Sequence, residues 1–314
     1  MTNKPHRPRT TASYRIWIAI ALAITSPLAL LAVIHSYKAD ALLRHLINTF
    51  VLHERYAGSS LNLDQYRVTI EAREIAGIDD DLSGLTYNIE TNTLFSVLNG
   101  QPLIVELDLE GRLLRKIEVS GVNDMEGITH VEGNRYVIAD EQDQRLLLLE
   151  ISADSDAIDV TDVPQLSLGI TSNGSNKDFE GVSWDDINRR LLVVKERNPL
   201  SIFEVTGFVD ESRQQTSLNI SKITPDKFRN IKLRDFSSIT YHDASGHLVL
   251  LSDESRMAAE YDFEGRAVSA IALWRGFHGL HKNVPQAEGI AIGPDKRVYI
   301  VSEPNLFYVF KPAD

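Results

Sequence analysis

Hydrophobic residues along this chain follow three patterns, the first of which is a long uncharged run near the N-terminus. From Ile16 to Ile34, 19 consecutive residues carry no charge. At about 1.5 Å of rise per residue, a helix of this length spans the hydrocarbon core of a bilayer. The run follows a basic stretch at residues 1–15, so the positive-inside rule predicts a cytoplasmic tail and export of everything after residue 35.

The alternative to a transmembrane anchor at 16–34 is a cleaved signal peptide. Such peptides have an apolar region of about 7–15 residues followed by a small-x-small cleavage site. Here the apolar run is longer, and His35, Tyr37 and Lys38 follow it without an Ala-x-Ala pattern. The sequence therefore favours an uncleaved anchor.

The second pattern, at residues 39–55 within the segment 35–65, has helical periodicity. Its apolar positions are typical of a short amphipathic helix next to the membrane. Three arrangements fit this helix: lying on the bilayer, self-association with a second copy, and packing on the rest of the chain. The apolar positions are Leu42, Leu43, Leu46, Ile47, Phe50 and Val51.

The third pattern is a repeat of short β-rich runs. Five segments share a polar start, a central Gly or Ser and an apolar end, and each is followed by two further strand-like runs. Aligned at the central position, the copies are 43, 54, 57 and 51 residues apart. The segments are Asp81–Tyr87, Asp124–His130, Asp178–Trp184, Asp235–Tyr241 and Gln286–Ile292.

Units of four short antiparallel strands at this period are typical of a β-propeller. Five copies predict an all-β, five-bladed propeller over residues 66–314. Six blades are the alternative, because the inserts at 152–177 and 209–232 are long enough for an irregular blade, although both resemble loops or partial outer strands. A β-sandwich with a second domain does not explain why the same pattern of residues occurs five times at the same position in successive units.

The run at 66–72 precedes the first unit and has no partner strand. We therefore expect it to close the ring as the outer strand of the last blade.

Charge and composition narrow the chemistry of the folded region. The formal net charge is −12, and the region after residue 15 carries −16. An acidic surface repels phosphate backbones, so we expect no nucleic-acid partner. The chain has no cysteine. Any metal must therefore be bound by oxygen or imidazole.

Acidic, amide and hydroxyl side chains recur at two positions of the repeat. Equivalent positions of radial blades lie on a common ring, so we expect these groups to meet near one end of the channel. Gathered carboxylates favour a cation, and Ca²⁺ accepts six to eight oxygen ligands. Alternatively, these groups only accept backbone N–H bonds where blades meet. The first ring is Ser83, Glu126, Glu180, Ser237 and Glu288, and the second is Asn99, Asp140, Glu196, Asp253 and Glu303.

Other chemistry-bearing residues fit structural or solvated roles better. The acids of the first insert lack the spacing of an EF-hand, which indicates a solvated loop. His278 and His281 are acid–base candidates, but no nucleophile motif accompanies them. Aromatic residues at matching repeat positions are expected to fill space between blades. The insert acids are Asp154, Asp156, Asp159 and Asp162, and the repeat aromatics are Tyr87, His130, Trp184 and Tyr241.

The segments LSGLTY, FEGVSW, VVKERNP, LSDESR and, at 279–310, GLHKNVPQAEGIAIGPDKRVYIVSEPNLFYVF occur in this order. Over residues 70–314 the chain thereby resembles the SdiA-regulated family. The resemblance implies an NHL-related propeller, a single-pass bacterial inner-membrane protein with its propeller in the periplasm, and a bound Ca²⁺. It carries a ligand role to Glu126, Glu180 and Glu288, with the second-ring acids Asp140, Glu196, Asp253 and Glu303 as further candidates. Serine at two first-ring positions leaves open whether the ion is centred.

Three functions fit these features. The favoured one is a non-catalytic binding or sensing module for a small molecule or an envelope protein, because no catalytic constellation accompanies the anchor and the repeat. The second is a calcium-dependent hydrolase of the lactonase, esterase or phytase type, with first-ring carboxylates and His278 or His281 as catalysts. The third is an architectural envelope component that self-associates through 39–55.

Overall fold

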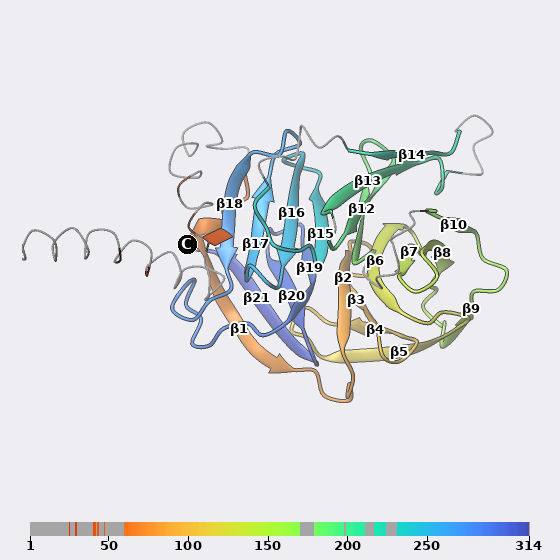
Figure 1. The fold of residues 1–314 in the computed structure, drawn as a ribbon. Helices are drawn as coiled ribbons and strands as arrows, with labels where there is room; N and C mark the ends of the chain where they lie inside the picture. The colour runs from red at the N-terminus through yellow and green to blue at the C-terminus, as the bar shows by residue number, and fades with distance from the viewer. Residues whose placement is uncertain are drawn as a thin grey trace, which may run out of the picture.

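Five sheets surround a central axis in the computed structural model (Figure 1). The model describes residues 60–169, 179–197, 199–210, 217–223 and 231–313, together with Thr25, Ala29, Asp40, Ala41, Leu43 and Ile47. Neighbouring innermost strands contact one another all the way round the ring. The described residues therefore confirm an all-β propeller of five blades, and the six-bladed alternative is wrong.

Each blade is one sheet whose first strand lies nearest the axis. Blade 1 contains β2 (Leu82–Asn88), β3 (Thr93–Leu98), β4 (Leu103–Leu107), β5 (Leu113–Ser120) and β9 (Ala157–Asp159), and blade 2 contains β6 (Met125–Glu132), β7 (Arg135–Asp140), β8 (Arg145–Glu150) and β10 (Gln165–Ser167). Blade 3 contains β11 (Gly181–Asp185), β12 (Arg190–Lys195), β13 (Ser201–Thr206) and β14 (Asn219–Lys222). Blade 4 contains β15 (Ser238–His242), β16 (His247–Ser252), β17 (Met257–Tyr261) and β18 (Ala267–Ala272), and blade 5 contains β19 (Ala287–Ile292), β20 (Val298–Ser302), β21 (Leu306–Pro312) and β1 (Tyr66–Glu74).

The hydrophobic core is divided into five clusters, one in each gap between neighbouring blades. In the gap between blades 5 and 1, for example, Leu82 and Val105 pack with Tyr299 and Val301. A single blade cannot cover both of its apolar faces, so burial is completed only when blades stack. This explains why the middle strands are apolar on both faces and do not alternate.

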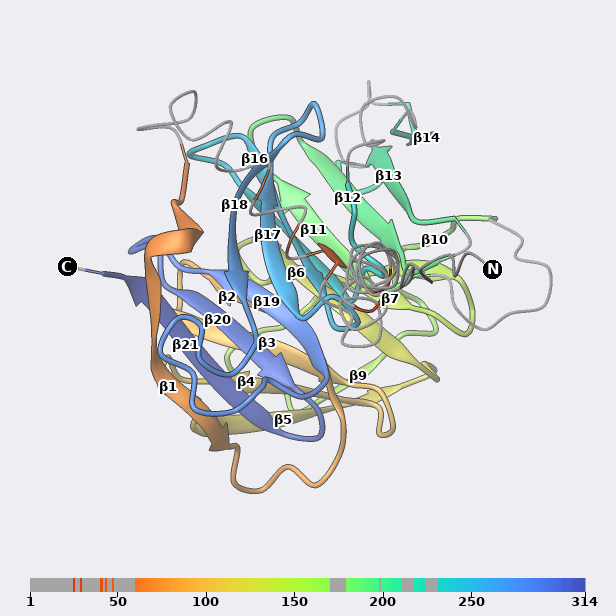
Figure 2. The same ribbon diagram turned by 60° about the vertical axis from the view of Figure 1, so that its left-hand side comes forward.

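Strand β1 closes the ring. It pairs antiparallel with β21, with Tyr66 opposite Pro312 and Glu74 opposite Leu306 (Figure 2). The closing strand expected at 66–72 is therefore confirmed. The residues just before it, which include the 3₁₀ turn η1 (Leu63–Gln65), are held on blade 4, where the Leu61 amide donates to Glu260 Oε1 at 3.0 Å.

The two inserts supply outer strands. In the first, β9 pairs parallel with β5 and β10 pairs antiparallel with β8. In the second, β14 pairs with β13. The long repeat spacings thus have two causes. Blade 1 has an additional edge strand, and the outer strands of blades 2 and 3 are separated by long loops from the strands with which they pair.

Hydroxyl groups near the ends of the inner strands link successive blades. Thr86 Oγ1 accepts a hydrogen bond from the His130 amide at 2.9 Å, and Thr129 Oγ1 accepts one from the Trp184 amide at 3.0 Å. Ser183 Oγ accepts a third from the next blade at 2.9 Å. The recurrent Thr or Ser of the repeat thereby fixes the register of one blade against the next.

The predicted cytoplasmic tail at 1–15 and nearly all of the predicted anchor at 16–34 lie outside the described residues. Within the part of the chain that is described, no helix has the length and apolar character needed to cross a bilayer. Of the segment 39–55, four residues are described, all helical. Ala41 is buried against blades 3 and 4, and Asp40 pairs with Arg234 at 2.7 Å. The start of this segment therefore packs on the propeller.

Candidate metal centre

An acidic cavity of about 320 Å³ lies on the propeller axis at the end where the inner strands begin. All five blades contribute to its wall. Carboxylates dominate the lining, and the guanidinium of Arg197 is the one cation among the described lining residues. The wall consists of Asn99, Asp124, Glu126, Glu141, Glu180, Glu196, Arg197, Asp235, Ser237, Asp253, Gln286, Glu288 and Glu303.

The first ring of predicted residues converges on this cavity. Glu126, Glu180 and Glu288 line it from blades 2, 3 and 5, and Ser237 lines it from blade 4. Ser83 of blade 1 donates to Glu126 Oε2 at 2.6 Å. Each of these residues is the second residue of an inner strand or immediately precedes one. Radial symmetry therefore brings together side chains that are far apart in sequence.

The second ring also converges, with a change at one position. Glu196, Asp253 and Glu303 follow the last residues of β12, β16 and β20, and they line the cavity together with Asn99 of blade 1. In blade 2, however, Asp140 is still within β7, and the residue after the strand is Glu141. The structure accordingly places Glu141, and not Asp140, on the cavity wall.

Asp140 faces away from the cavity, where it holds an arginine. Its side chain is fully buried and its Oδ2 accepts hydrogen bonds from Nε and Nη2 of Arg145 at 3.0 and 2.9 Å. The equivalent residues of the other blades are Leu98, Lys195, Ser252 and Ser302.

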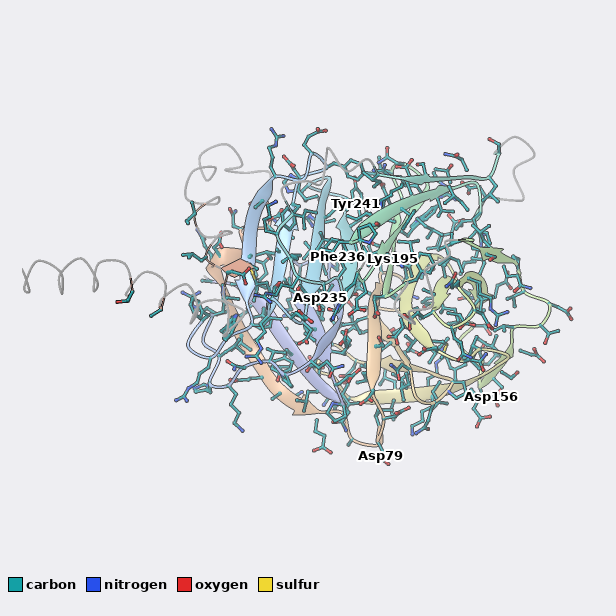
Figure 3. The ribbon with its side chains drawn as sticks, viewed as in Figure 1. Asp79, Asp156, Lys195, Asp235, Phe236 and Tyr241 are labelled. Carbon is teal, nitrogen blue, oxygen red and sulfur yellow. The ribbon has the colours of Figure 1, made fainter. Side chains whose placement is uncertain are left out.

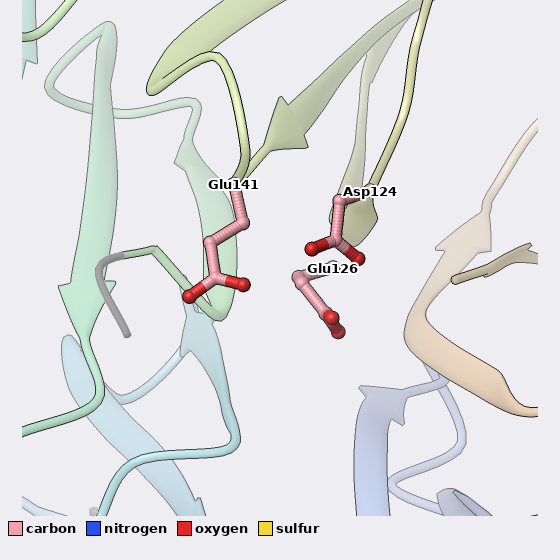
Figure 4. Close-up of side chains that lie close together, drawn as sticks. All are labelled: Asp124, Glu126 and Glu141. Atoms are coloured by element: carbon pink, nitrogen blue, oxygen red, sulfur yellow. The ribbon is translucent and has the colours of Figure 1, made fainter. Parts of the chain in front are cut away.

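Three carboxylates of blade 2 form the tightest group in the cavity. One oxygen from each of Asp124, Glu126 and Glu141 lies within 4.8 Å of the other two (Figure 4). Two ligands of one Ca²⁺, each about 2.3–2.6 Å from the ion, are at most roughly 5 Å apart. Glu126 is further fixed by the Asn99 amide, which donates to its Oε1 at 3.0 Å. The spacing of these oxygens therefore fits a single calcium ion.

Burial and mutual repulsion make the cavity unfavourable for several charged carboxylates at once. Burial raises the pKa of Glu126 to about 8 and that of Glu303 to about 7. Burial, and then repulsion from Glu126 and Glu141, raises the pKa of Glu180 well above its usual value. Burial, and then repulsion from Glu303 and Glu126, does the same for the pKa of Glu288. Protons or a metal cation must compensate this charge.

Arg197 neutralises one side of the cavity. Its Nη2 lies 2.7 Å from Glu196 Oε1, and its Nη1 lies 3.0 Å from Glu254 Oε1. Asp235 is further away, at 3.9 Å from Nη2. Blades 3 and 4 thus have a guanidinium beside their carboxylates, whereas Glu126 of blade 2 accepts hydrogen bonds from Ser83 and Asn99.

The donor set of the cavity suits a hard cation. Among the described lining residues the possible ligands are carboxylate, amide and hydroxyl oxygens, and none is histidine. Oxygen-only sites select Ca²⁺ or Mg²⁺, whereas zinc prefers imidazole or thiolate. A cavity of about 320 Å³ also has room for water ligands. The residues present therefore fit Ca²⁺.

Inner strands of neighbouring blades come into close main-chain contact just beyond the acidic cavity. A Cβ atom on Gly127 would lie 3.0 Å from the Val182 nitrogen, and one on Gly289 would lie 2.7 Å from the carbonyl carbon of Gly84. Main-chain contact this close leaves no room for a side chain at Gly127 and Gly289. These glycines thus allow neighbouring inner strands to pack closely.

The other sequence candidates lie elsewhere. His278 Nδ1 contacts the Tyr66 carbonyl oxygen at 2.9 Å, and His281 pairs with Glu71 at 2.8 Å, so both lie against the outer strand β1. Asp156 of the first insert lies at the periphery of the molecule, whereas Asp235 lies near its centre (Figure 3). Asp154 and Asp159 accept local hydrogen bonds from Ser152 and Thr161. All four acids of the insert are exposed to solvent, as expected, although Asp159 lies in the outer strand β9 and not in a loop.

Sequence reasoning missed three acidic residues of the cavity and its arginine. Asp124 and Asp235 occupy the first position of the repeated segment, so the recurrence of aspartate there was an available signal. Glu141 was missed because two consecutive acids leave the strand end ambiguous. Arg197 lies in a loop and has no counterpart in the repeat.

The sequence model of the SdiA-regulated family matches residues 58–311, and the chain belongs to this family. Three solved structures match the chain at low identity. A chain of a nidogen/laminin complex is 13% identical with a TM-score of 0.47, and the match covers 71% of this chain and 72% of that one. A luciferin-regenerating enzyme is 13% identical with a TM-score of 0.47, covering 77% and 94%. The Cps50 (Swd1) β-propeller domain of Myceliophteria thermophila is 11% identical with a TM-score of 0.38, covering 78% and 67%.

Proposed function

We propose that this member of the SdiA-regulated family is a calcium-binding, membrane-anchored propeller that acts as a non-catalytic binding or sensing module on the periplasmic side of a bacterial inner membrane. The observation that carries the calcium part is the convergence of carboxylates from blades 2, 3, 4 and 5 in one buried cavity. The uncharged run at 16–34 after a basic tail supports the membrane part.

The ion is held to one side of the axis, next to blade 2. Asp124, Glu126 and Glu141 are its principal ligands, because their oxygens lie within the span that one Ca²⁺ permits. Glu180 and Glu288 approach from blades 3 and 5 and complete the charge balance. Arg197 already compensates Glu196 of blade 3.

The role of the site is to stabilise one end of the propeller. When bound, calcium supplies positive charge that lowers repulsion among the buried carboxylates. Glu126, Glu180 and Glu288 each lie at the start of an inner strand, so a common ion restrains three blades together. The loops that surround the cavity are thereby held in one arrangement.

A calcium titration of the full-length chain in nanodiscs tests the metal part. We expect one calcium ion per chain and a higher melting temperature with calcium than with chelator. Glu180→Gln is expected to weaken binding at least about tenfold. Glu110→Gln is the matched control, because Glu110 pairs with Arg112 in an exposed outer turn. Absence of bound calcium, with equal melting temperatures in calcium and chelator, rejects this part.

No observation on the described residues supports the hydrolase alternative. Its imidazole candidates, His278 and His281, contact β1 at the edge of blade 5 and do not line the cavity. Hydrolysis assays with lactones, aryl esters and phosphate esters in the presence of calcium distinguish a hydrolase from a non-catalytic module. Turnover that is lost in Glu180→Gln would favour the hydrolase over a non-catalytic module.

The membrane part has its own test. We expect the full-length chain to sediment with membranes through a carbonate wash, and the propeller to be digested by protease added to the periplasmic side. Release of the chain by carbonate contradicts the anchor.

A further inference from the structure

A second cavity, of about 490 Å³, opens at the opposite end of the propeller axis, where the inner strands end. No residue lines both cavities. The central glycines of the repeat lie between the two cavities along the inner strands, because Gly84 and Gly127 directly precede the lining residues Leu85 and Ile128. A ligand in this distal cavity is thus separated from the carboxylates of the metal centre.

The inner part of the distal cavity is apolar. Four blades each contribute the residue that follows the central Gly or Ser of the repeat, and all four are buried: Leu85, Ile128, Val182 and Ile239. Ile89, Ala244 and Pro294 extend the apolar lining to the mouth. Ile89 is 66% exposed, so apolar surface continues outward from the cavity.

Aromatic rings form the middle of the wall. Tyr87, His130, Trp184 and Tyr241 occupy one repeat position and all line the cavity. They also pack between blades as the sequence suggested; Tyr87, for example, stacks on Tyr299 with ring centroids 6.3 Å apart. Their packing holds the rings in place before any ligand arrives, which lowers the entropy cost of binding.

The ionised groups of this wall are acidic. Asp186 and Asp243 lie at the mouth on neighbouring blades, and no lysine or arginine is present among the described lining residues. Arg189 lies next to this wall: it is 3.5 Å from Asp186 and 5.1 Å from the centroid of the Trp184 ring, and it also pairs with Asp210. Burial lowers the pKa of His242, so this lining residue is neutral at pH 7. Among the described lining residues the ionised groups are therefore two carboxylates, which favour a cation over an anion.

We propose that the distal cavity binds a small organic ammonium ion, with its apolar body against the inner wall and its charged group near Asp186 and Asp243. The volume is in the range of sites for small molecules, about 300–1,000 Å³. Aromatic walls favour the same ligand, because cations are attracted to ring faces. This inference rests on the proposed binding role of the propeller, but not on its calcium.

Calorimetry with three probes of similar shape tests the charge preference. Full-length chain in nanodiscs, with saturating calcium and empty nanodiscs as the blank, is titrated with 2-phenylethylammonium, 2-phenylethanol and phenylacetate. We expect the ammonium ion to bind about threefold to tenfold more tightly than the alcohol, and phenylacetate to bind most weakly. Equal affinities, or a preference for phenylacetate, overturn the proposal.

Two variants locate the site. Asp243→Asn, at an exposed turn, is expected to remove most of the preference for the ammonium ion, and Asp156→Asn, at the exposed periphery of the first insert, is the matched control that keeps it. Ala244→Trp at the mouth is expected to weaken both the ammonium ion and the alcohol by filling the cavity. Unchanged binding in Asp243→Asn and Ala244→Trp overturns the proposal.

The calcium proposal and the ammonium proposal can be rejected independently of each other. Calcium binding without ammonium binding rejects the distal site and leaves the metal centre intact. Ammonium binding that persists in Glu180→Gln, after calcium is lost, supports the distal site as a separate compartment.

Discussion

Asp140 and Glu141 are consecutive acids with opposite surroundings. Asp140 pairs with Arg145 within the blade, whereas Glu141 lines the axial cavity. In a β-strand, successive side chains point to opposite faces, so one residue of register separates the two roles. The sequence repeat could locate this pair but not choose between its members, because the choice depends on where β7 ends.

We predict opposite effects for substitutions of this pair. Glu141→Gln removes a charge from the closest carboxylate group and is expected to weaken calcium binding at least about tenfold. Asp140→Asn is expected to leave calcium affinity within about twofold but to lower the free energy of unfolding by about 1–3 kcal/mol, since Arg145 loses its buried partner. Calcium calorimetry and urea unfolding measure the two effects. Weaker calcium binding in Asp140→Asn alone would reverse the assignment.

Arg197 provides a second prediction at this scale. Replacing it with glutamine leaves Glu196 and Glu254 without their guanidinium and makes the cavity more negative. We expect calcium to bind about threefold to tenfold more tightly, and the calcium-free protein to be less stable. Arg112→Gln, at an outer turn with a side chain 71% exposed, is the control. Weaker calcium binding in Arg197→Gln would indicate that the arginine positions ligands and does not compete with the ion.

At the scale of elements, β1 determines whether the ring is closed. Tyr66 begins this strand, is fully buried, and donates from its hydroxyl to the Lys296 carbonyl oxygen at 2.9 Å. Its ring belongs to the cluster between blades 4 and 5. The contact therefore joins the beginning of the propeller to its last two blades.

Tyr66→Ala is expected to lower the free energy of unfolding by about 3–5 kcal/mol, because it leaves a large cavity between blades. Leu114→Ala, at a position 53% exposed on β5, is the matched control and is expected to change stability by less than about 0.5 kcal/mol. Urea unfolding monitored by circular dichroism compares them. Similar losses in both variants would mean that closure contributes little.

Much of the arrangement of the strands could be predicted from the sequence, because each copy of the repeat corresponds to one blade. The five inner strands and the closing strand follow from the aligned repeat segments, whereas the sequence left a sixth blade open until the inserts were seen to form outer strands. The pairing of β9 with β5 could not be predicted, since three residues of an insert carry no repeat signal. The role of Arg197 was equally hidden, because its partners come from blades 3 and 4 and meet only in the folded ring.

At the scale of the whole molecule, the acidic cavity couples stability to pH. Glu126 and Glu303 have pKa values raised to about 8 and about 7, and the pKa values of Glu180 and Glu288 are raised as well. Between the usual value of 4.5 and these raised values, the folded state binds more protons than the unfolded state. Stability without calcium must therefore fall as pH rises through this window.

We predict that the calcium-free protein is more stable at pH 5.5 than at pH 8, by about 2–4 kcal/mol. Saturating calcium should remove most of this difference, because the cation favours the ionised carboxylates. Urea unfolding at both pH values, with and without chelator, measures it. A calcium-free protein that gains stability between pH 5.5 and pH 8 would contradict the raised pKa values.

The central claim is that one calcium ion lies beside blade 2, in the cavity where carboxylates from separate blades converge. Anomalous scattering from crystals of the full-length protein, grown with calcium or a lanthanide substitute, tests it most directly. We expect a single strong peak within ligand distance of Asp124, Glu126 and Glu141. A cavity without a peak, or a peak only at the surface of the molecule, would contradict the claim.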